Sequence, residues 1–295
     1  MHTHAPARRG HVALALVALY LIWGSTYLAI RFALEGGFPP FLLGGIRFLV
    51  AGGVLYGVLR LRGVPAPSRP QWRNAAVMGV LLLLLGNGLV NYGEQTVASG
   101  MTAVIVSSSA LWMGVFAALR GHRPSALEWI GLGIGFVGVL WLSAGGSLAA
   151  TPAGLAALLV ASVAWSFGSI WSKGRDLPTP FMTAATQMLC GGVAMCVVAL
   201  VLGERFDGMP TAHAIGAFWY LVVAGSLAGF SAYIWLLHHV RPALATSYAY
   251  VNPAIAVALG ALLAQERFGM RELVAMGVIL VGVLAITVAK SGSAK

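Results

Sequence analysis

Polar residues that could recognise a small molecule stand inside long apolar segments of this sequence. Asn87 and Asn91 are four residues apart, so a helix would place both amides on one face, and Tyr92 and Gln95 follow directly. A polar stripe inside a membrane segment is expected to face protein or water and not lipid. We therefore expect these side chains to line a substrate path, with hydrogen bonding between helices as the alternative.

A second polar cluster surrounds the pair Asn252-Pro253. Proline has no N–H and clashes with the carbonyl four residues back, here that of Ala249, so the helix is expected to kink. The freed backbone acceptor is tolerated in a membrane only where neighbours, water or a ligand satisfy it. The same turns also carry Ser247, Tyr248 and Tyr250. We expect Tyr248 and Asn252 to bind substrate; a kink that serves packing alone is the alternative.

Large aromatic side chains add to these clusters. Trp23 and Trp165 occupy matching places in the two halves of the chain, each well inside an apolar segment and away from the headgroup region where tryptophan is common. Ser108 and Trp112 stand where the first half corresponds to Asn252-Pro253. We expect the two tryptophans to wall one cavity from opposite sides, with plain packing as the alternative.

One basic residue, Arg47, lies within a hydrophobic run, shortly after Pro40. A charge at the bilayer centre costs about 2.5–3.5 kcal/mol on insertion scales, and a long side chain near a helix end can reach outward to the interface. We expect Arg47 to be a structural charge at the extracellular interface, with a clamp for a substrate carboxylate as the alternative. Gln187 at the corresponding place in the second half excludes a symmetric salt bridge.

Residue patterns for catalysis or metal binding are missing from the sequence. It has no H-E-x-x-H, no G-x-S-x-G and no carboxylate pair at helical spacing inside an apolar segment. His238 and His239 are adjacent and cannot share a helix face, and Cys190 and Cys196 are six apart and point to different faces. We expect no catalytic residue, no metal and no cofactor, which argues against a membrane-embedded enzyme. A channel is harder to exclude, although no charged ring is present.

The elements that position these residues are membrane helices. The 295 residues are 59% hydrophobic and 9% charged, with a mean hydropathy of +0.87, whereas a soluble domain carries about 25% charged residues. A bilayer span needs about 20 apolar residues. Apolar segments lie at residues 12–33, 41–59, 74–93, 98–119, 126–144, 153–172, 180–202, 213–236, 242–263 and 270–289. The sequence therefore predicts an all-α integral membrane protein of ten transmembrane helices.

The net charge of +10 follows the predicted topology. With both termini in the cytoplasm, most of the 18 basic residues fall on the inside, as the positive-inside rule requires. We expect cytoplasmic tails at 1–11 and 290–295 and a multi-pass location in the bacterial inner membrane.

The two halves of the chain resemble each other. Trp23 aligns with Trp165, Pro40-Phe41 with Pro180-Phe181, and the Gly138-Val139-Leu140 run with Gly282-Val283-Leu284. We expect one five-helix repeat at 12–146 and a second at 147–289. Because each repeat has an odd number of spans, the second must be inverted, which is a transporter architecture with its substrate site between the halves.

Four stretches resemble the drug/metabolite transporter superfamily, its EamA-type repeat and especially the YddG-like bacterial amino-acid exporters. They are Trp23-Gly24-Ser25, Pro39-Pro40 before the helix with Arg47, the run from Glu94 to Ala103, and Asn252-Pro253 followed by Glu266. The resemblance implies a ten-helix exporter whose central cavity comes largely from the third, fourth, eighth and ninth helices. The sequence departs from it at Leu111-Trp112, where the family often has proline, so the two central helices are expected to bend unequally.

The expected function is export of small metabolites, most of all amino acids, neutral and aromatic ones included. The substrate-binding residues would be Trp23, Asn87, Asn91, Tyr92, Gln95, Ser108, Trp112, Trp165, Tyr248 and Asn252, with Pro253 as the helix kink. Partners would be the solute and the lipid bilayer, without nucleic acid, and the chain would be a monomer or a weak homodimer. A proton-coupled exporter of nucleobases, sugars or cationic compounds is the alternative.

Carriers that are driven by protons commonly have a titratable Asp, Glu or His inside a membrane span. No predicted span has an Asp, Glu or His near its centre, and Glu94 and Glu128 stand near helix ends, where water is expected to reach them. The sequence therefore favours a facilitator without obligatory ion coupling. Glu94 is the exception to watch if it folds inward.

Overall fold

The computed structural model describes residues 9–121, 125–143, 151–240, 248–266 and 268–292, and within these ranges the chain has helices and no strand. The helices of the first half are α1 Arg9–Glu35, α2 Pro40–Leu61, α3 Arg69–Met78, η1 Gly79–Gly88, α4 Leu89–Gly93, α5 Ser99–Ser107, α6 Ser109–Leu119 and α7 Ala126–Ser143. Those of the second half are α8 Pro152–Trp171, α9 Pro180–Val201, α10 Ala212–Tyr220, η2 Leu221–Phe230, α11 Ser231–His239, α13 Tyr248–Leu263 and α14 Met270–Gly292.

Seven helical stretches of the described residues are long and apolar enough to cross a membrane: Gly10–Glu35, Pro40–Leu61, Arg69–Gly93, Ser99–Phe116, Pro152–Trp171, Pro180–Val201 and Ala212–Leu237. The described apolar parts of α13 and α14 are shorter, Val251–Leu263 and Leu273–Gly282. The chain is thus an all-helical membrane protein.

Local sequence sets where several helices begin. Proline stands in the first turn of α2, α8 and α9, where its missing N–H costs no hydrogen bond. Ser68 and Gln71 form a capping box at α3, and the hydroxyl of Thr151 accepts a hydrogen bond from the Gly154 N–H at the start of α8.

A π-helix interrupts the third span of each half, and the two π-helices lie at matching positions. The segment η1 joins α3 to α4, and η2 joins α10 to α11, so each forms the middle of one continuous rod. The offset between η1 and η2 equals that between Trp23 and Trp165. π-Helical turns are rare and occur frequently at functional sites.

The two central helices, which are the fourth and the ninth span, differ in structure as well as in proline content. The fourth span has no proline and breaks at Ser108, between α5 and α6, where the Ser108 N–H bonds the Ile105 carbonyl at 3.0 Å. Pro253 lies inside the helix α13.

Hydrogen bonds define two ends of the molecule. At the acidic end, the C-terminus of α1 meets the start of α10 through the Thr211 N–H and the Gly36 carbonyl, 3.0 Å apart. Thr151, at the start of α8, lies 2.9 Å from Thr96 at the same end. Hence α1 finishes where its counterpart α8 begins. This end carries Glu35, Glu94, Glu204, Asp207 and Glu266, with Arg31 and Arg205.

The opposite, basic end is held by bonds between the halves as well. Gln71 donates to the Asp176 carboxylate at 3.0 Å, and Arg120 donates to the Ile170 carbonyl at 2.7 Å. The nearby helix ends carry Arg60, Arg62, Arg69, Arg73, Lys173 and Arg175.

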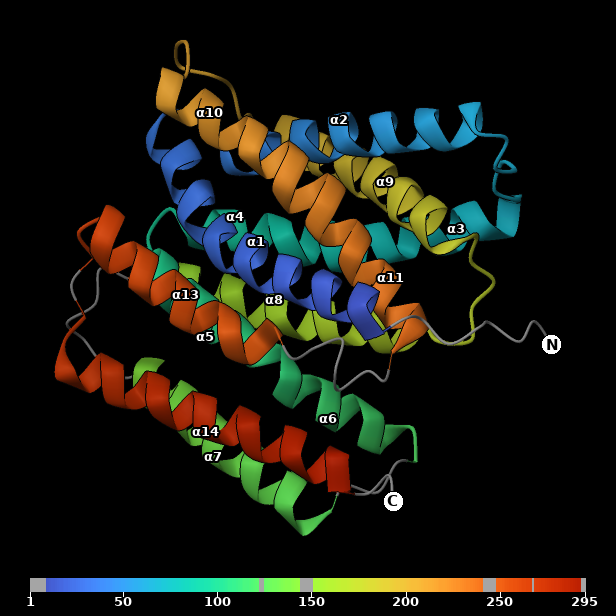
Figure 1. The fold of residues 1–295 in the computed structure, drawn as a ribbon. Helices are drawn as coiled ribbons and strands as arrows, with labels where there is room; N and C mark the ends of the chain where they lie inside the picture. The colour runs from blue at the N-terminus through green and yellow to red at the C-terminus, as the bar shows by residue number, and fades with distance from the viewer. Residues whose placement is uncertain (1–8, 122–124, 144–150, 241–247, 267, 293–295) are drawn as a thin grey trace.

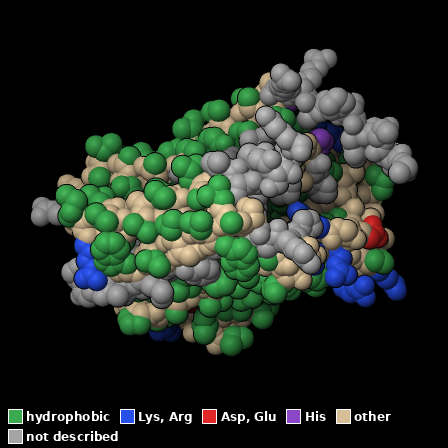
Figure 2. Space-filling model, turned by 90° about the horizontal axis from the view of Figure 1, so that it is seen from below, with side chains coloured by type: hydrophobic (Ala, Val, Ile, Leu, Met, Phe, Trp, Pro, Cys, Tyr) green, Lys and Arg blue, Asp and Glu red, His purple; other side chains and the backbone are tan. Residues whose placement is uncertain are grey.

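Helix packing follows the symmetry of the halves. α2 packs on α9 and α7 on α14, so counterparts meet each other, while α1 packs on α13 and α8 on α5 and α6 (Figure 1). Seen from below, the face that includes α7 and α14 has a broad hydrophobic surface with basic side chains toward its ends (Figure 2). Trp129, Val137, Val281 and Leu284 are among the exposed apolar residues there. This surface suits contact with lipid.

Candidate functional site

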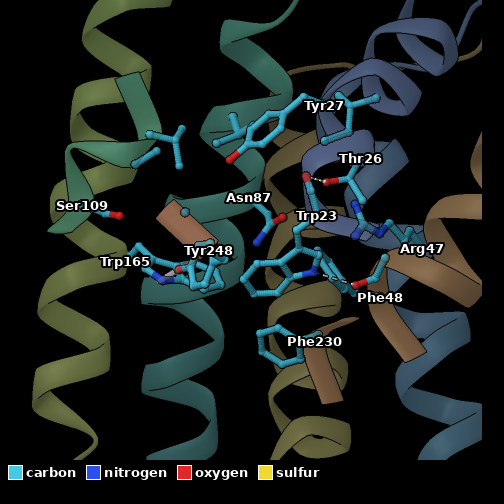
Figure 3. Close-up of a pocket in the computed structure, with 16 residues that line it drawn as sticks. Trp23, Thr26, Tyr27, Arg47, Phe48, Asn87, Ser109, Trp165, Phe230 and Tyr248 are labelled. Carbon is cyan, nitrogen blue, oxygen red and sulfur yellow. Dashed lines mark hydrogen bonds between the residues drawn. The ribbon is translucent and has the colours of Figure 1, made fainter. Parts of the chain in front are cut away.

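A central cavity of about 70 Å³ lies between the halves (Figure 3). Its wall draws on both halves, with residues Trp23, Thr26, Tyr27, Ile30, Arg47, Phe48, Gly86, Asn87, Val90, Val106, Ser109, Ala161, Trp165, Gly225, Phe230 and Tyr248.

Aromatic rings from the two halves meet at this cavity. The Trp23 ring lies 5.8 Å from Trp165 and 5.0 Å from Tyr248, both edge to face, and 5.2 Å from Tyr233. The Trp23 indole N–H donates to the Gly225 carbonyl of η2 at 3.2 Å (Figure 3). The three predicted residues Trp23, Trp165 and Tyr248 therefore do lie together, although Trp23 and Trp165 touch each other and do not face across an open space.

Arg47 is placed differently from its prediction as a charge at the extracellular interface. The residue is 3% exposed, lines the central cavity, and donates from Nε to the Ser226 hydroxyl at 2.7 Å. Its guanidinium carbon lies 4.8 Å from the centre of the Phe48 ring. The interface prediction is corrected for a physical reason: η2 packs against α2 and encloses the guanidinium between helices, so it cannot extend outward.

Two glycines of η2 make room for this arrangement. A Cβ on Gly225 would lie 2.7 Å from Nη2 of Arg47, and a Cβ on Gly229 would lie 2.5 Å from the indole nitrogen of Trp23. Real Cβ atoms essentially never come this close to another heavy atom. The glycines thus allow Arg47 and Trp23 to pack directly on the π-helix.

The predicted polar stripe on the third span divides. Asn87 lines the central cavity, whereas Asn91 is buried and donates to the Pro40 carbonyl at 3.0 Å, which is the helix-to-helix bond considered as the alternative. Tyr92 is 39% exposed and stacks on Phe41, and Gln95 lines a separate cavity at the acidic end. Asn87 lies near the end of the π-helix η1, whereas Asn91 and Tyr92 lie in α4 and Gln95 in the turn after it.

The predicted residues of the central helices mostly stay behind the cavity wall. Ser108 is 1% exposed and its neighbour Ser109 lines the cavity instead. Trp112 is half-buried on α6 and is not among the residues that line the central cavity. The Asn252 amide, oriented so that its nitrogen donates, reaches the Tyr248 and Tyr20 carbonyls at 3.2 Å each. Asn252 therefore joins α13 to α1. Ser247 and the side chains of Tyr250, His238 and Glu128 lie outside the described residues.

Several lining residues were not predicted. Thr26 and Tyr27 are three and four residues after Trp23, so the helical period could have indicated them. Phe48 and Phe230 carry no such signal, because every face of an apolar span looks alike in the sequence.

A second cavity of about 400 Å³ lies at the acidic end and is called here the acidic-end cavity. Its wall consists of Arg31, Leu34, Glu35, Glu94, Gln95, Thr96, Val97 and Ala98.

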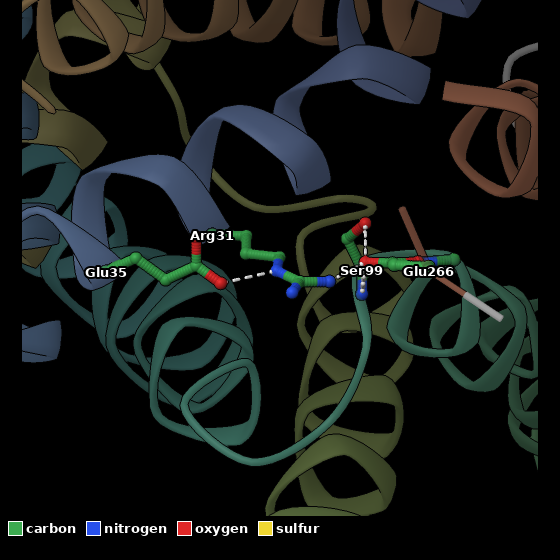
Figure 4. A network of polar contacts seen from close by, with 5 residues as sticks. Arg31, Glu35, Ser99 and Glu266 are labelled. Carbon is green, nitrogen blue, oxygen red and sulfur yellow. Dashed lines mark hydrogen bonds and ion pairs between the residues drawn. The ribbon is translucent and has the colours of Figure 1, made fainter. Parts of the chain in front are cut away.

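Arg31 and Glu266 join α1, α5 and the segment after α13 beside the acidic-end cavity (Figure 4). Arg31 contacts the Glu35 carboxylate at 2.7 Å and the Glu266 carboxylate at 2.5 Å. Glu266 also accepts hydrogen bonds from the Ser99 N–H at 2.8 Å and the Gly100 N–H at 3.1 Å. A carboxylate at a helix N-terminus stabilises unpaired N–H groups and the positive end of the dipole. Glu266 of the second half thereby holds α1 and α5 of the first.

Glu94 departs from its prediction as a carboxylate that water reaches. It is 6% exposed, and neither carboxylate oxygen has a hydrogen-bond partner among the described residues. Burial raises the pKa of the Glu94 carboxyl well above its usual value; Glu266 raises it further and Arg31 lowers it. The turn at Glu94-Gln95-Thr96 joins α4 to α5, and Tyr27 and Arg31 of α1 lie near the Glu94 carboxyl.

Comparison with known proteins places the chain among transporters. Its sequence matches the profile of the EamA-like transporter family twice, over residues 10–144 and 152–288. It is 42% identical over 277 residues to the uncharacterized inner membrane transporter YedA of Escherichia coli K12, covering 94% of this chain and 90% of that protein. The uncharacterized transporter YoaV of Bacillus subtilis strain 168 is 24% identical over 287 residues, covering 94% and 96%. One solved crystal structure shares the fold, with a TM-score of 0.70 and 19% identity over 96% of this chain and 99% of that one.

Proposed function

Because this chain belongs to the EamA-like transporter family of the drug/metabolite transporter superfamily, we propose that it exports small metabolites by alternating access around the central cavity. It is a multi-pass inner membrane protein. Amino acids, neutral and aromatic ones included, are the proposed substrates.

The proposed topology has ten spans in two inverted five-helix repeats, one within 12–146 and one within 147–289, with both termini cytoplasmic. α7, α13 and α14 would complete the seven stretches that length and apolarity identify. The basic end would face the cytoplasm and the acidic end the periplasm, because positive charge is retained inside. The meeting of α1 and α8 at the acidic end with opposite chain directions supports the inversion.

One observation carries the substrate proposal: a buried guanidinium beside an aromatic wall. Arg47 lines the cavity, and the ion pairs of the described residues lie elsewhere, at Arg31 and Arg205. A carboxylate is the natural partner of an unpaired guanidinium, since Arg pairs with it in bidentate geometry. Trp23, Trp165 and Tyr248 supply apolar and aromatic surface. This combination suits a zwitterion with an apolar side chain, and it disfavours a cationic compound.

The cavity must enlarge to hold such a solute. Ligand pockets usually measure about 300–1,000 Å³, far above the ~70 Å³ between the halves. We propose that rocking of one half against the other separates Trp23 from Trp165 and opens the site to one side at a time.

The test is counterflow of radiolabelled L-phenylalanine into liposomes that contain the purified protein and unlabelled phenylalanine. A saturable, transient overshoot is expected, because a carrier exchanges solute across the membrane and a channel does not. Trp23→Ala is expected to reduce the initial rate at least tenfold. Trp141→Ala, on the exposed face of α7, is the matched control and should retain the rate.

A panel of nucleobases, sugars and quaternary amines completes the experiment. Counterflow of one of these compounds, without counterflow of any amino acid, would refute the proposed substrate class. The proposal that the protein is a carrier would still stand. Flux that rises linearly with concentration and shows no overshoot would refute the carrier itself.

A further inference from the structure

The wall between the two cavities is one helical turn thick. On α1, Tyr27 lines the central cavity and Arg31, four residues later, lines the acidic-end cavity. On the third span, Val90 lines the central cavity and Glu94 lines the acidic-end cavity, and the Glu94 N–H donates to the Val90 carbonyl at 2.9 Å. One α-helical turn rises about 5.4 Å. These two turns must separate for the cavities to join.

Glu94 is the unusual group in this wall. Both of its oxygens are buried without a hydrogen-bond partner among the described residues, yet the residue borders a cavity of about 400 Å³. An ionised carboxylate is strongly disfavoured in such surroundings unless it is paired. Arg31, the nearest cation, is already paired with Glu35 and Glu266.

We propose that Glu94 is a proton-binding site of the gate at the acidic end: it holds a proton while the wall is closed and releases it to the acidic-end cavity when the wall opens. Orientation of this end toward the periplasm rests on the proposed function; proton binding does not. Because Tyr27 and Val90 separate Glu94 from the central cavity, the proton enters and leaves on one side. It controls the gate without being carried across.

The groups that face Glu94 agree with this assignment. Tyr27 and Arg31 approach from α1, where Glu35 lines the same cavity, and Glu266 approaches from the segment after α13. The other packed elements, α2, α8 and η1, contribute Phe41, Leu158 and apolar residues near α4, and η1 and α8 contain no titratable residue. Arg31 is thus the one described cation that offsets a Glu94 charge, against the repulsion of Glu266.

The direction of the pH effect follows from the proton count. In the closed state the pKa of the Glu94 carboxyl is raised, so this carboxyl holds a proton. In the open state the carboxyl is solvated and has lost the proton at neutral pH. Low pH therefore favours the closed wall. As the pH rises through the raised pKa of the closed state, the closed state becomes less stable relative to the open state. The total change in the closed-to-open ratio is a factor of about ten for each unit by which the pKa of Glu94 in the closed state exceeds that in the open state.

Thiol labelling measures this gate without any solute. In a background carrying Cys190→Ala and Cys196→Ala, Ser109→Cys reports the central cavity behind the wall and Ala98→Cys the acidic-end cavity in front of it. Spheroplasts are treated with a membrane-impermeant cationic thiosulfonate between pH 6 and 9. The ratio of the two labelling rates, compared with the same ratio in Glu94→Gln, separates opening of the gate from the pH dependence of thiol chemistry, and in the parent it is expected to rise about tenfold or more across this range. In Glu94→Gln, which resembles the protonated form, the ratio should stay low and flat.

Infrared titration of the purified protein gives a second readout. The carbonyl band of a protonated carboxyl should be present at pH 7 and should disappear in Glu94→Gln, while Glu35→Gln, at an exposed carboxylate, should retain it. Absence of that band, or a labelling ratio that is flat in the parent or equally pH-dependent in Glu94→Gln, would overturn the proposal. Neither result depends on whether amino acids are transported, so failure of the proposed function is separately visible.

Discussion

Arg47 shows how one residue depends on neighbours that the sequence does not reveal. Its type and its position in an apolar run are visible, but its partners Ser226 and Gly225 belong to η2, nearly two hundred residues away. A helix that is apolar on all sides gives no sign of which face meets lipid. Trp23 and Trp165 were predicted to border one cavity from their matching places in the two halves, and Tyr248 from its position beside Asn252-Pro253. The same comparison of the halves matched Arg47 with Gln187 and so gave it no partner.

Replacement of Arg47 tests the carboxylate clamp. Arg47→Gln introduces the residue type of Gln187, which stands at the corresponding place in the second half. The new amide still supplies a hydrogen-bond donor for the Ser226 hydroxyl. Charged hydrogen bonds contribute about 1.5–3 kcal/mol, so the KM for phenylalanine is expected to rise roughly 10–100-fold. Phenethylamine, which lacks the carboxylate, supplies the control in competition assays: its weak inhibition should not weaken further in Arg47→Gln. An unchanged KM would return Arg47 to a structural role.

At the level of elements, the sequence predicted the helices better than their irregularities. Every predicted apolar segment with described residues is helical, and the Pro40, Pro152 and Pro180 starts follow from proline chemistry. The π-helices were missed, because a hydropathy pattern does not distinguish i→i+5 from i→i+4 hydrogen bonding. Asn91 and Tyr92 were assigned to the substrate path because the sequence does not show that Asn91 meets Pro40 and Tyr92 meets Phe41 at the start of α2.

Glycines on η2 provide a test of the π-helix as a packing surface. Gly229→Ala would put a methyl group against the Trp23 indole, and overpacking of this kind typically costs about 1–3 kcal/mol. We expect a lower melting temperature and transport reduced several-fold. Gly216→Ala on α10 has open space around its Cβ and should leave both unchanged. Equal behaviour of the two variants would show that η2 adapts freely.

At the scale of the whole molecule, the halves are joined at both ends by polar contacts, and the fold carries a titratable site on one side of the cavity. One-sided proton binding predicts no coupling to a proton gradient. Liposomes given a pH gradient and equal phenylalanine on both sides should show no accumulation above equilibrium, although the rate should vary with pH on the acidic-end side. Accumulation that a protonophore abolishes and Glu94→Gln removes would instead identify Glu94 as a coupling site.

The small volume of the central cavity, about 70 Å³, bears on how the unloaded carrier returns. With Trp23 and Trp165 in contact, the closed central site encloses only this small volume between the halves, so the protein passes through its closed state without solute and without a large empty void there. Reorientation without cargo is then inexpensive, and net export does not require a returning counter-solute. Preloaded liposomes diluted into solute-free buffer should empty at a rate within a few-fold of exchange, a behaviour that separates a uniporter from an obligatory exchanger.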